Sequence, residues 1–138
     1  MLFRSGRFGA DWRATPSLFS ESFAEFFKSE RPTITAYESA QAALKAYQAE
    51  VDRLFDRVDV ILTPTVPITA PRIAGPIDGA TILRNTWPFN AAGTPVISLP
   101  CRSSDPAGTL PVGLQLIAKR GNDDLLLRAA RMIAEALP

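Results

Sequence analysis

The chain has 138 residues, of which 46% are hydrophobic and 21% charged, a balance typical of a globular rather than a disordered protein. With 15 basic and 14 acidic side chains, the net charge of +1 gives no electrostatic basis for binding nucleic acid or an anionic membrane. The absence of histidine and the single cysteine exclude Ser–His–Asp triads, Cys–His pairs, His-containing or four-cysteine metal sites and an internal disulfide.

The same features give expectations about location and cofactors. No apolar run approaches the roughly 20 residues that a membrane-spanning helix needs. Segment 1–14 has no hydrophobic stretch typical of a secretory signal. With Cys101 as the only cysteine, a cytoplasmic setting is expected. We expect no cofactor and no metal.

The N-terminal part predicts an arm followed by two helices. Residues 1–14 show no period and predict irregular structure, and a short helix over 17–28 is expected to end before Pro32. Residues 35–38, Thr-Ala-Tyr-Glu, fit a capping box in which Thr35 caps a long helix reaching to about Arg57. Its apolar residues recur at three-and-four spacing: Ala40, Ala43, Leu44, Tyr47, Val51, Leu54 and Phe55. This stripe is typical of a core-facing surface rather than a cofactor site.

The first strand is predicted over 58–63. It contains an unbroken apolar run from Val60 to Leu62, which indicates a strand covered on both faces. Three prolines then forbid regular ladder pairing and predict an extended connection: Pro64, Pro67 and Pro71. Residues 73–80 are expected to form a loop.

The C-terminal part predicts one short helix, a hairpin and a final helix. The short helix is expected within 81–92. Strands over 96–99 and 112–118 are expected to pair as an antiparallel hairpin across a type I turn at 105–108. Asn122 is expected to cap the last helix, whose apolar side carries leucines, alanines and an isoleucine.

These elements predict an α/β layer structure with helices packed on a small mixed sheet. We expect a single domain, with 1–34 as an irregular arm and short helix and 35–138 as its main part. In a sheet as small as three strands, both faces of an apolar strand are not easily covered. The fold is therefore expected to be an incomplete part of a larger one.

Six segments of the chain also follow one another in an order that suggests a family. They are Asp59–Thr65 (DVILTPT), Ala70-Pro71, Asn85–Pro95 (NTWPFNAAGTP), Ser98–Pro100, Leu110–Ile117 (LPVGLQLI) and the terminal helix with its paired leucines. Together they resemble the C-terminal region of the amidase-signature family of amide hydrolases. The resemblance covers roughly residues 35–138 of this chain.

This resemblance implies hydrolysis of carbon–nitrogen amide bonds by a Ser–cis-Ser–Lys triad, in which one serine attacks, a second relays protons and lysine is the base. The chain has no Gly-Gly-Ser-Ser-Gly-Gly loop, and Lys28, Lys45 and Lys119 match no family motif. We therefore assign no catalytic residue. The expected function is the C-terminal portion of an amidase, inactive alone because the triad lies upstream. The alternative is a free-standing, non-catalytic α/β interaction module.

Three other groups with reactive side chains are interpreted as structural. Ser103-Ser104 is expected in a solvated turn, and Cys101 is expected to be an ordinary thiol because no base accompanies it. A Ser98–Lys119 dyad is not expected, because both residues belong to scaffold segments of the resemblance.

Thr86, Trp87 and Phe89 are the candidate substrate-binding residues. The resemblance implies that segment 85–93 packs near the substrate cleft, where these side chains would line the acyl side of the pocket. The alternative is that the aromatic rings fill the core. The expected partner is a small-molecule amide substrate, if an N-terminal half completes the enzyme. Nucleic acid and membrane are not expected, whereas the chain alone is expected to self-associate through an exposed sheet edge.

Overall fold

The computed structural model describes residues 11, 14–21, 25, 32–73, 75, 78–101 and 110–137. The elements in chain order are η1 (Pro16–Leu18), α4 (Ile34–Leu54), β1 (Val60–Pro64), α5 (Gly79–Leu83), α6 (Trp87–Ala92), β2 (Val96–Cys101), β3 (Val112–Ala118) and α7 (Asp123–Ala136). Two compact units are present, Met1–Glu38 and Ser39–Pro138. The predicted division into 1–34 and 35–138 stays a prediction.

The described part of the first unit holds two short turns and the first residues of α4. The Thr15 amide donates to the Asp11 carbonyl at 2.9 Å, which is a helical turn where an irregular arm was predicted. A 3-10 turn with proline in its first positions then covers Pro16–Leu18. Half of the predicted helix over 17–28 lies outside the described residues. Near its predicted start the backbone of Phe19 is extended, whereas Glu21 and Glu25 are helical.

Helix α4 begins earlier than the sequence suggested. The Ala36 amide donates to Thr33 Oγ1 at 3.1 Å, so Thr33 caps the helix and the prediction of Thr35 is wrong. Thr33, directly after Pro32, has the same hydroxyl as Thr35 and caps the helix equally well. The helix can therefore begin earlier without losing its capping hydrogen bond. The helix ends at Leu54 instead of Arg57. The next three amides each donate to the carbonyl three residues earlier, as in a 3-10 turn.

The sheet has three strands in the order β1-β3-β2, and both pairings are antiparallel. The predicted hairpin between β2 and β3 is confirmed, although its turn at 105–108 lies outside the described residues. The expectation of a mixed sheet is wrong for the described strands. Strands β1 and β2 do run parallel, but β3 lies between them and opposes both.

Burial differs from the prediction along β1. Val60 and Ile61 are half-buried, but Leu62 is 51% exposed, because β1 is an edge strand in the described sheet. Pro64 ends this strand instead of following it, which an edge position tolerates. The strand covered on both faces is β3, where residues 115–118 are all buried.

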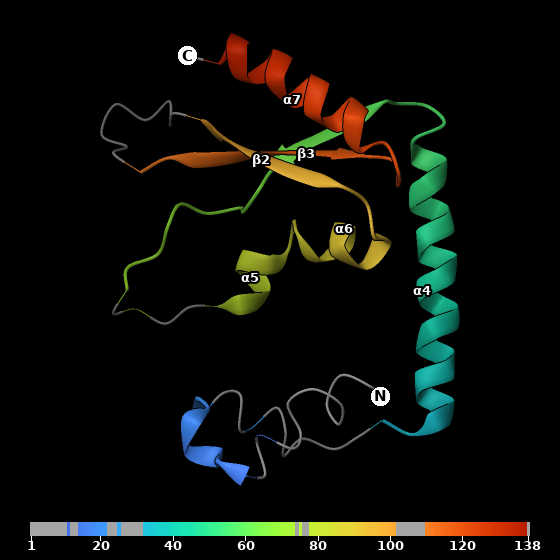
Figure 1. The fold of residues 1–138 in the computed structure, drawn as a ribbon, viewed down its shortest axis with the longest axis vertical. Helices are drawn as coiled ribbons and strands as arrows, with labels where there is room; N and C mark the ends of the chain where they lie inside the picture. The colour runs from blue at the N-terminus through green and yellow to red at the C-terminus, as the bar shows by residue number, and fades with distance from the viewer. Residues whose placement is uncertain are drawn as a thin grey trace. The chain divides into compact units, whose positions relative to one another are not determined.

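The apolar core lies between the sheet and α7, which covers one face, while α5 and α6 lie on the other (Figure 1). Leu116 and Ala118 of β3 pack against Leu126 and Ala130 of α7. Helix α7 follows Asn122 as predicted, with two aspartates in its first turn that suit the positive end of the helix dipole. The Asn122 side chain itself makes no capping hydrogen bond. No described helix combines the length and apolar character that crossing a membrane requires.

The opposite face of the sheet is polar at its centre. Thr63, Gln115 and Ser98 lie opposite one another in register across the three strands and so share this face. Just after the end of β1, the Thr65 hydroxyl lies 2.5 Å from the Ser98 hydroxyl. The Thr65 amide donates to the Gly113 carbonyl at 2.8 Å. A Cβ at position 113 would lie 2.5 Å from Thr65 Oγ1 and 2.8 Å from Ser98 Oγ. The hydroxyl pair therefore occupies the space that a side chain on Gly113 would need.

We predict that Gly113→Ala lowers the free energy of unfolding by about 1–3 kcal/mol, because the methyl group forces the hydroxyl pair apart. Urea unfolding followed by circular dichroism measures the loss. Gly79→Ala is the matched control, since nothing lies within 4 Å of a Cβ there and the residue is helical. If both variants unfold at the same urea concentration as the parent, the packing argument for Gly113 is wrong.

Candidate functional site

Two short helices lie around the predicted site residues. Helix α6 falls within 81–92, where one short helix was expected, and α5 begins at Gly79, inside the segment 73–80 that was predicted to be a loop. Asp78 caps α5, with Oδ1 accepting from the Ala80 amide at 3.0 Å and Oδ2 from the Thr81 hydroxyl at 2.5 Å. The hydrogen bond from Thr81, followed by that from Ala80, lowers the pKa of the Asp78 carboxyl from its ordinary value. The two helices are separate because Pro88 suits a first turn better than an interior. It lies in the first turn of α6, which Gly93 ends with a φ of 71°.

Hydrogen bonds from the sheet hold the junction between α5 and α6. Gln115 is 1% exposed, and its Nε2 donates to the Asn85 carbonyl at 3.0 Å and to Thr63 Oγ1 at 3.2 Å. Asn85 Nδ2 in turn donates to the Pro64 carbonyl at 2.8 Å. The junction is therefore fixed against β1 and β3 by polar contacts.

Helix α4 holds α6 from a second direction. The Tyr47 hydroxyl donates to the Pro88 carbonyl at 3.2 Å, and Gln48 Nε2 donates to the Ala91 carbonyl at 3.0 Å. A helix as short as α6 is marginal by itself, so these external bonds define its position. Side chains on α6 are thus presented from a fixed backbone.

The structure places the three predicted substrate-binding residues differently from one another. Trp87 is 62% exposed, so its ring does not fill the core of the described chain. Thr86 is half-buried and its hydroxyl donates to the Leu83 carbonyl at 3.3 Å. Phe89 is also half-buried, and its carbonyl accepts from the Gly93 amide and the Thr94 hydroxyl. Trp87 lines one of the two hollows described below, and Thr86 and Phe89 line neither of these two.

That hollow has a volume of about 760 Å³, and we call it the α6 hollow. Its lining residues are Tyr47, Arg84, Trp87, Pro88, Asn90 and Ala91. Sequence reasoning missed Arg84 as a site residue because no motif marks it. The only available signal was the spacing of three residues between Arg84, Trp87 and Asn90, which turns them toward one side of a helical segment.

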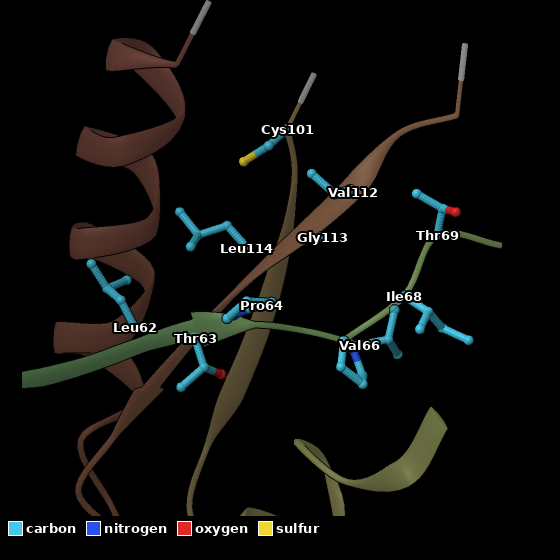
Figure 2. Close-up of a pocket in the computed structure, with 11 residues that line it drawn as sticks. Leu62, Thr63, Pro64, Val66, Ile68, Thr69, Cys101, Val112, Gly113 and Leu114 are labelled. Atoms are coloured by element: carbon cyan, nitrogen blue, oxygen red, sulfur yellow. The ribbon is translucent and has the colours of Figure 1, made fainter. Parts of the chain in front are cut away.

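A second hollow, of about 540 Å³, lies beside the end of β1 and is nearly all apolar. Figure 2 shows Leu62, Leu114 and Cys101 reaching toward the side of the sheet where α7 lies, with Val66 and Ile68 on the connection that follows β1. No charged side chain lines this hollow in the described part of the chain. It resembles an uncovered part of the core more than a site that orients a polar ligand.

Of the reactive groups considered in the sequence, Cys101 is a half-buried free thiol, and the others are engaged elsewhere or lie outside the described residues. Ser98 contacts the Thr65 hydroxyl, and Lys119 Nζ pairs with Asp56 Oδ1 at 3.3 Å, so these two side chains do not form a dyad. Arg120 pairs with Asp52, and this hydrogen bond lowers the pKa of the Asp52 carboxyl. Ser103 and Ser104 lie outside the described residues. Within the residues that are described, no cluster of potential metal ligands occurs.

Comparison with known proteins decides the family. The sequence profile of the Amidase family matches residues 20–127. The chain belongs to the amidase family. A glutamyl-tRNA(Gln) amidotransferase subunit from Streptomyces coelicolor is 40% identical over 104 residues, which is 72% of this chain and 21% of that protein. Its counterpart from Methanococcoides burtonii is 44% identical over 85 residues, which is 59% of this amidase chain and 17% of the relative. The chain thus spans about a fifth of the length of the curated relatives it matches.

Solved amidase-family structures share the fold of this chain. The glutamyl-tRNA(Gln) amidotransferase subunit from Thermotoga maritima superposes with a TM-score of 0.66 and 30% identity, over 98% of this chain and 29% of that one. For 6-aminohexanoate cyclic dimer hydrolase with bound substrate the TM-score is 0.75 at 28% identity, over 94% and 31% of the two chains. A crystal structure described as an amidase, at 24% identity, agrees in fold with a TM-score of 0.83. The predicted family and the predicted partial α/β fold are both confirmed.

We predict that Gln115→Met lowers the free energy of unfolding by about 1–3 kcal/mol, because the Asn85 carbonyl loses a donor that water cannot easily replace. Methionine keeps the side-chain length, so the change isolates the two hydrogen bonds. Urea unfolding measures the loss. Gln48→Met removes one bond at a more exposed place and should cost less than about 1 kcal/mol. Equal losses in the two variants would contradict a special role for the buried carboxamide.

Proposed function

We propose that this chain is the C-terminal portion of an amidase that hydrolyses carbon–nitrogen bonds, and that it contributes three strands and one wall of the substrate pocket. The observation that carries the proposal is coverage. The Thermotoga maritima structure matches 98% of this chain with only 29% of its own length, so the remaining part of such a fold has no counterpart here. The catalytic Ser–Ser–Lys would come from that remaining part.

The chemistry of the described residues supports this division. Acyl transfer needs an activated nucleophile, a base and preorganised donors for the oxyanion. Here Ser98 is paired with Thr65, and Lys119 is paired with Asp56 near the surface. Both side chains support local structure, and neither is placed to activate the other. We therefore keep the view that the chain alone is inactive.

The pocket wall is assigned to α6. Trp87 would face the acyl side of a small-molecule amide, while Thr86 and Phe89 shape the backbone that carries it. The net charge of +1 lends no support to tRNA as a ligand, although the curated relatives carry that word in their names. We infer a cytoplasmic location from the single cysteine. For the chain alone we infer self-association through the open edge of β1, where Leu62 is 51% exposed.

We predict that the chain by itself hydrolyses neither acetamide nor benzamide above the buffer rate, because it supplies no activated nucleophile. Fusion to the N-terminal part of an amidase-family relative should restore release of ammonia from at least one of them. Ammonia is measured with a coupled dehydrogenase assay. Replacing the nucleophilic serine of the supplied part is the control, and it should abolish the restored activity.

Two results would contradict this proposal. Hydrolysis by the isolated chain would mean that its nucleophile lies within these residues. A monomeric chain that unfolds cooperatively and gains no activity on fusion would favour the free-standing interaction module instead.

In the active fusion, we predict that Trp87→Ala changes the ratio of kcat/KM between benzamide and acetamide about three- to tenfold, because an aromatic wall favours the aromatic acyl group. Stability should change by less than about 0.5 kcal/mol, since the ring is largely exposed. Met132→Ala is the control, a large and 71% exposed side chain on α7. A loss of stability with an unchanged ratio would show that Trp87 packs instead of selecting substrate.

A further inference from the structure

We propose that the α6 hollow binds a planar carboxylate, with the Arg84 guanidinium pairing to the carboxylate and the flat body of the ligand lying against the Trp87 ring. The volume of about 760 Å³ falls within the range of ligand pockets, roughly 300–1,000 Å³. The site goes beyond the proposed function. It rests on that function in one respect, because the carboxylate would belong to the amide substrate or to its product. Binding itself requires no hydrolysis.

The first argument is the charge of the lining. Arg84 is the single charged residue among those that line the α6 hollow within the described chain. No carboxylate of the described residues lies within 4.0 Å of its guanidinium. Hydrogen bonds from Thr81 and Ala80 already occupy the oxygens of Asp78 and lower the pKa of that carboxyl, and Arg84 contributes only a small electrostatic part to this shift. The positive charge of Arg84 is therefore available to an anion that enters the hollow.

The second argument is the difference between occupied and available polar groups. The Tyr47 hydroxyl is used by the Pro88 carbonyl, so Tyr47 offers its ring to the hollow. The side chains of Arg84 and Asn90 make no hydrogen bond within the described part of the chain. Both carry several N–H donors, which suit the two oxygens of a carboxylate.

The third argument concerns the shape of the ligand. Trp87 leaves 62% of its surface exposed next to Arg84. An indole face attracts flat apolar groups, and a guanidinium recognises a carboxylate in its own plane. Together they favour a carboxylate attached to a flat or ring-shaped body over a phosphate or an aliphatic amine.

The fourth argument is preorganisation. Hydrogen bonds made by Gln115 and Asn85 fix the junction before α6, and those from Tyr47 and Gln48 fix its first turn and its end. A site whose backbone is already fixed loses less entropy when a ligand binds. The apolar hollow beside β1 has no cationic side chain among its lining residues. It would therefore not prefer a carboxylate over its neutral counterpart.

The test uses the whole chain with Trp12→Phe, which leaves Trp87 as the single indole. Benzoate and its neutral counterpart benzamide are titrated while Trp87 fluorescence is recorded, and saturation-transfer NMR on the ligand protons reports binding independently. We expect saturable binding of benzoate that is about tenfold tighter than that of benzamide. The tenfold ratio corresponds to about 1.4 kcal/mol for the charge-assisted, bidentate pair with Arg84. Added salt should weaken benzoate binding more than benzamide binding.

Arg84→Gln should remove the preference for benzoate and leave benzamide binding unchanged. Arg128→Gln is the matched control, an exposed arginine on α7 outside the hollow. Circular dichroism checks that both variants keep the fold. Equal affinities for the two ligands, an unaltered preference in Arg84→Gln, or no saturable binding by either method would each overturn the site. If the active fusion hydrolyses amides while benzoate fails to bind, this site is wrong and the proposed function stands.

Discussion

The arrangement of the sheet and α6 depends on one buried carboxamide. Gln115 is 1% exposed in the middle strand, and burying an amide is costly unless it is hydrogen-bonded. Its two donor contacts, to Thr63 and to the Asn85 carbonyl, remove that cost and join β1, β3 and the α5–α6 junction at one point. The same residue fixes the register of β3. A slip by one position would turn Gln115 toward α7 and place Leu116 among hydroxyl groups.

The two faces of the sheet therefore have different roles. Apolar contact with α7 supplies most of the packing, since Leu116, Leu126 and Ala130 are nearly inaccessible. The face toward α6 buries Ile117, with Ala92 of α6 also buried, and it adds direction, because hydrogen bonds require defined angles and hydrophobic contact does not. Gly113 belongs to this second face. Because Gly113 has no side chain, the hydroxyls of Thr65 and Ser98 can pack directly against the backbone of β3. Exposed Leu62 on the edge of β1 fits a chain that forms part of a larger amidase fold.

How far the sequence predicts this structure depends on whether a signal is local. Strand β3 and helix α7 could be predicted because their apolar periods are complete within a few residues. The cap of α4 was misplaced because Thr33 and Thr35 offer the same chemistry two residues apart. One helix was expected within 81–92, whereas Pro88 lies in the first turn of α6 and so begins a second helix after α5. Arg84 could not be predicted, because its role depends on α4 and α6 meeting in space.

The residues of α6 and of the turns beside it separate into those that hold the backbone and those that would meet the proposed ligand. Asn85 acts through its side-chain hydrogen bond to the Pro64 carbonyl, and Pro88 and Gly93 act through main-chain geometry and main-chain hydrogen bonds. Trp87 and Arg84 take no part in those bonds and lie at the surface of the hollow. Substituting either one should therefore alter what binds while the backbone stays fixed. Under the proposed site, the segment identifies the amidase family through its scaffold, while the two exposed side chains would act on the ligand.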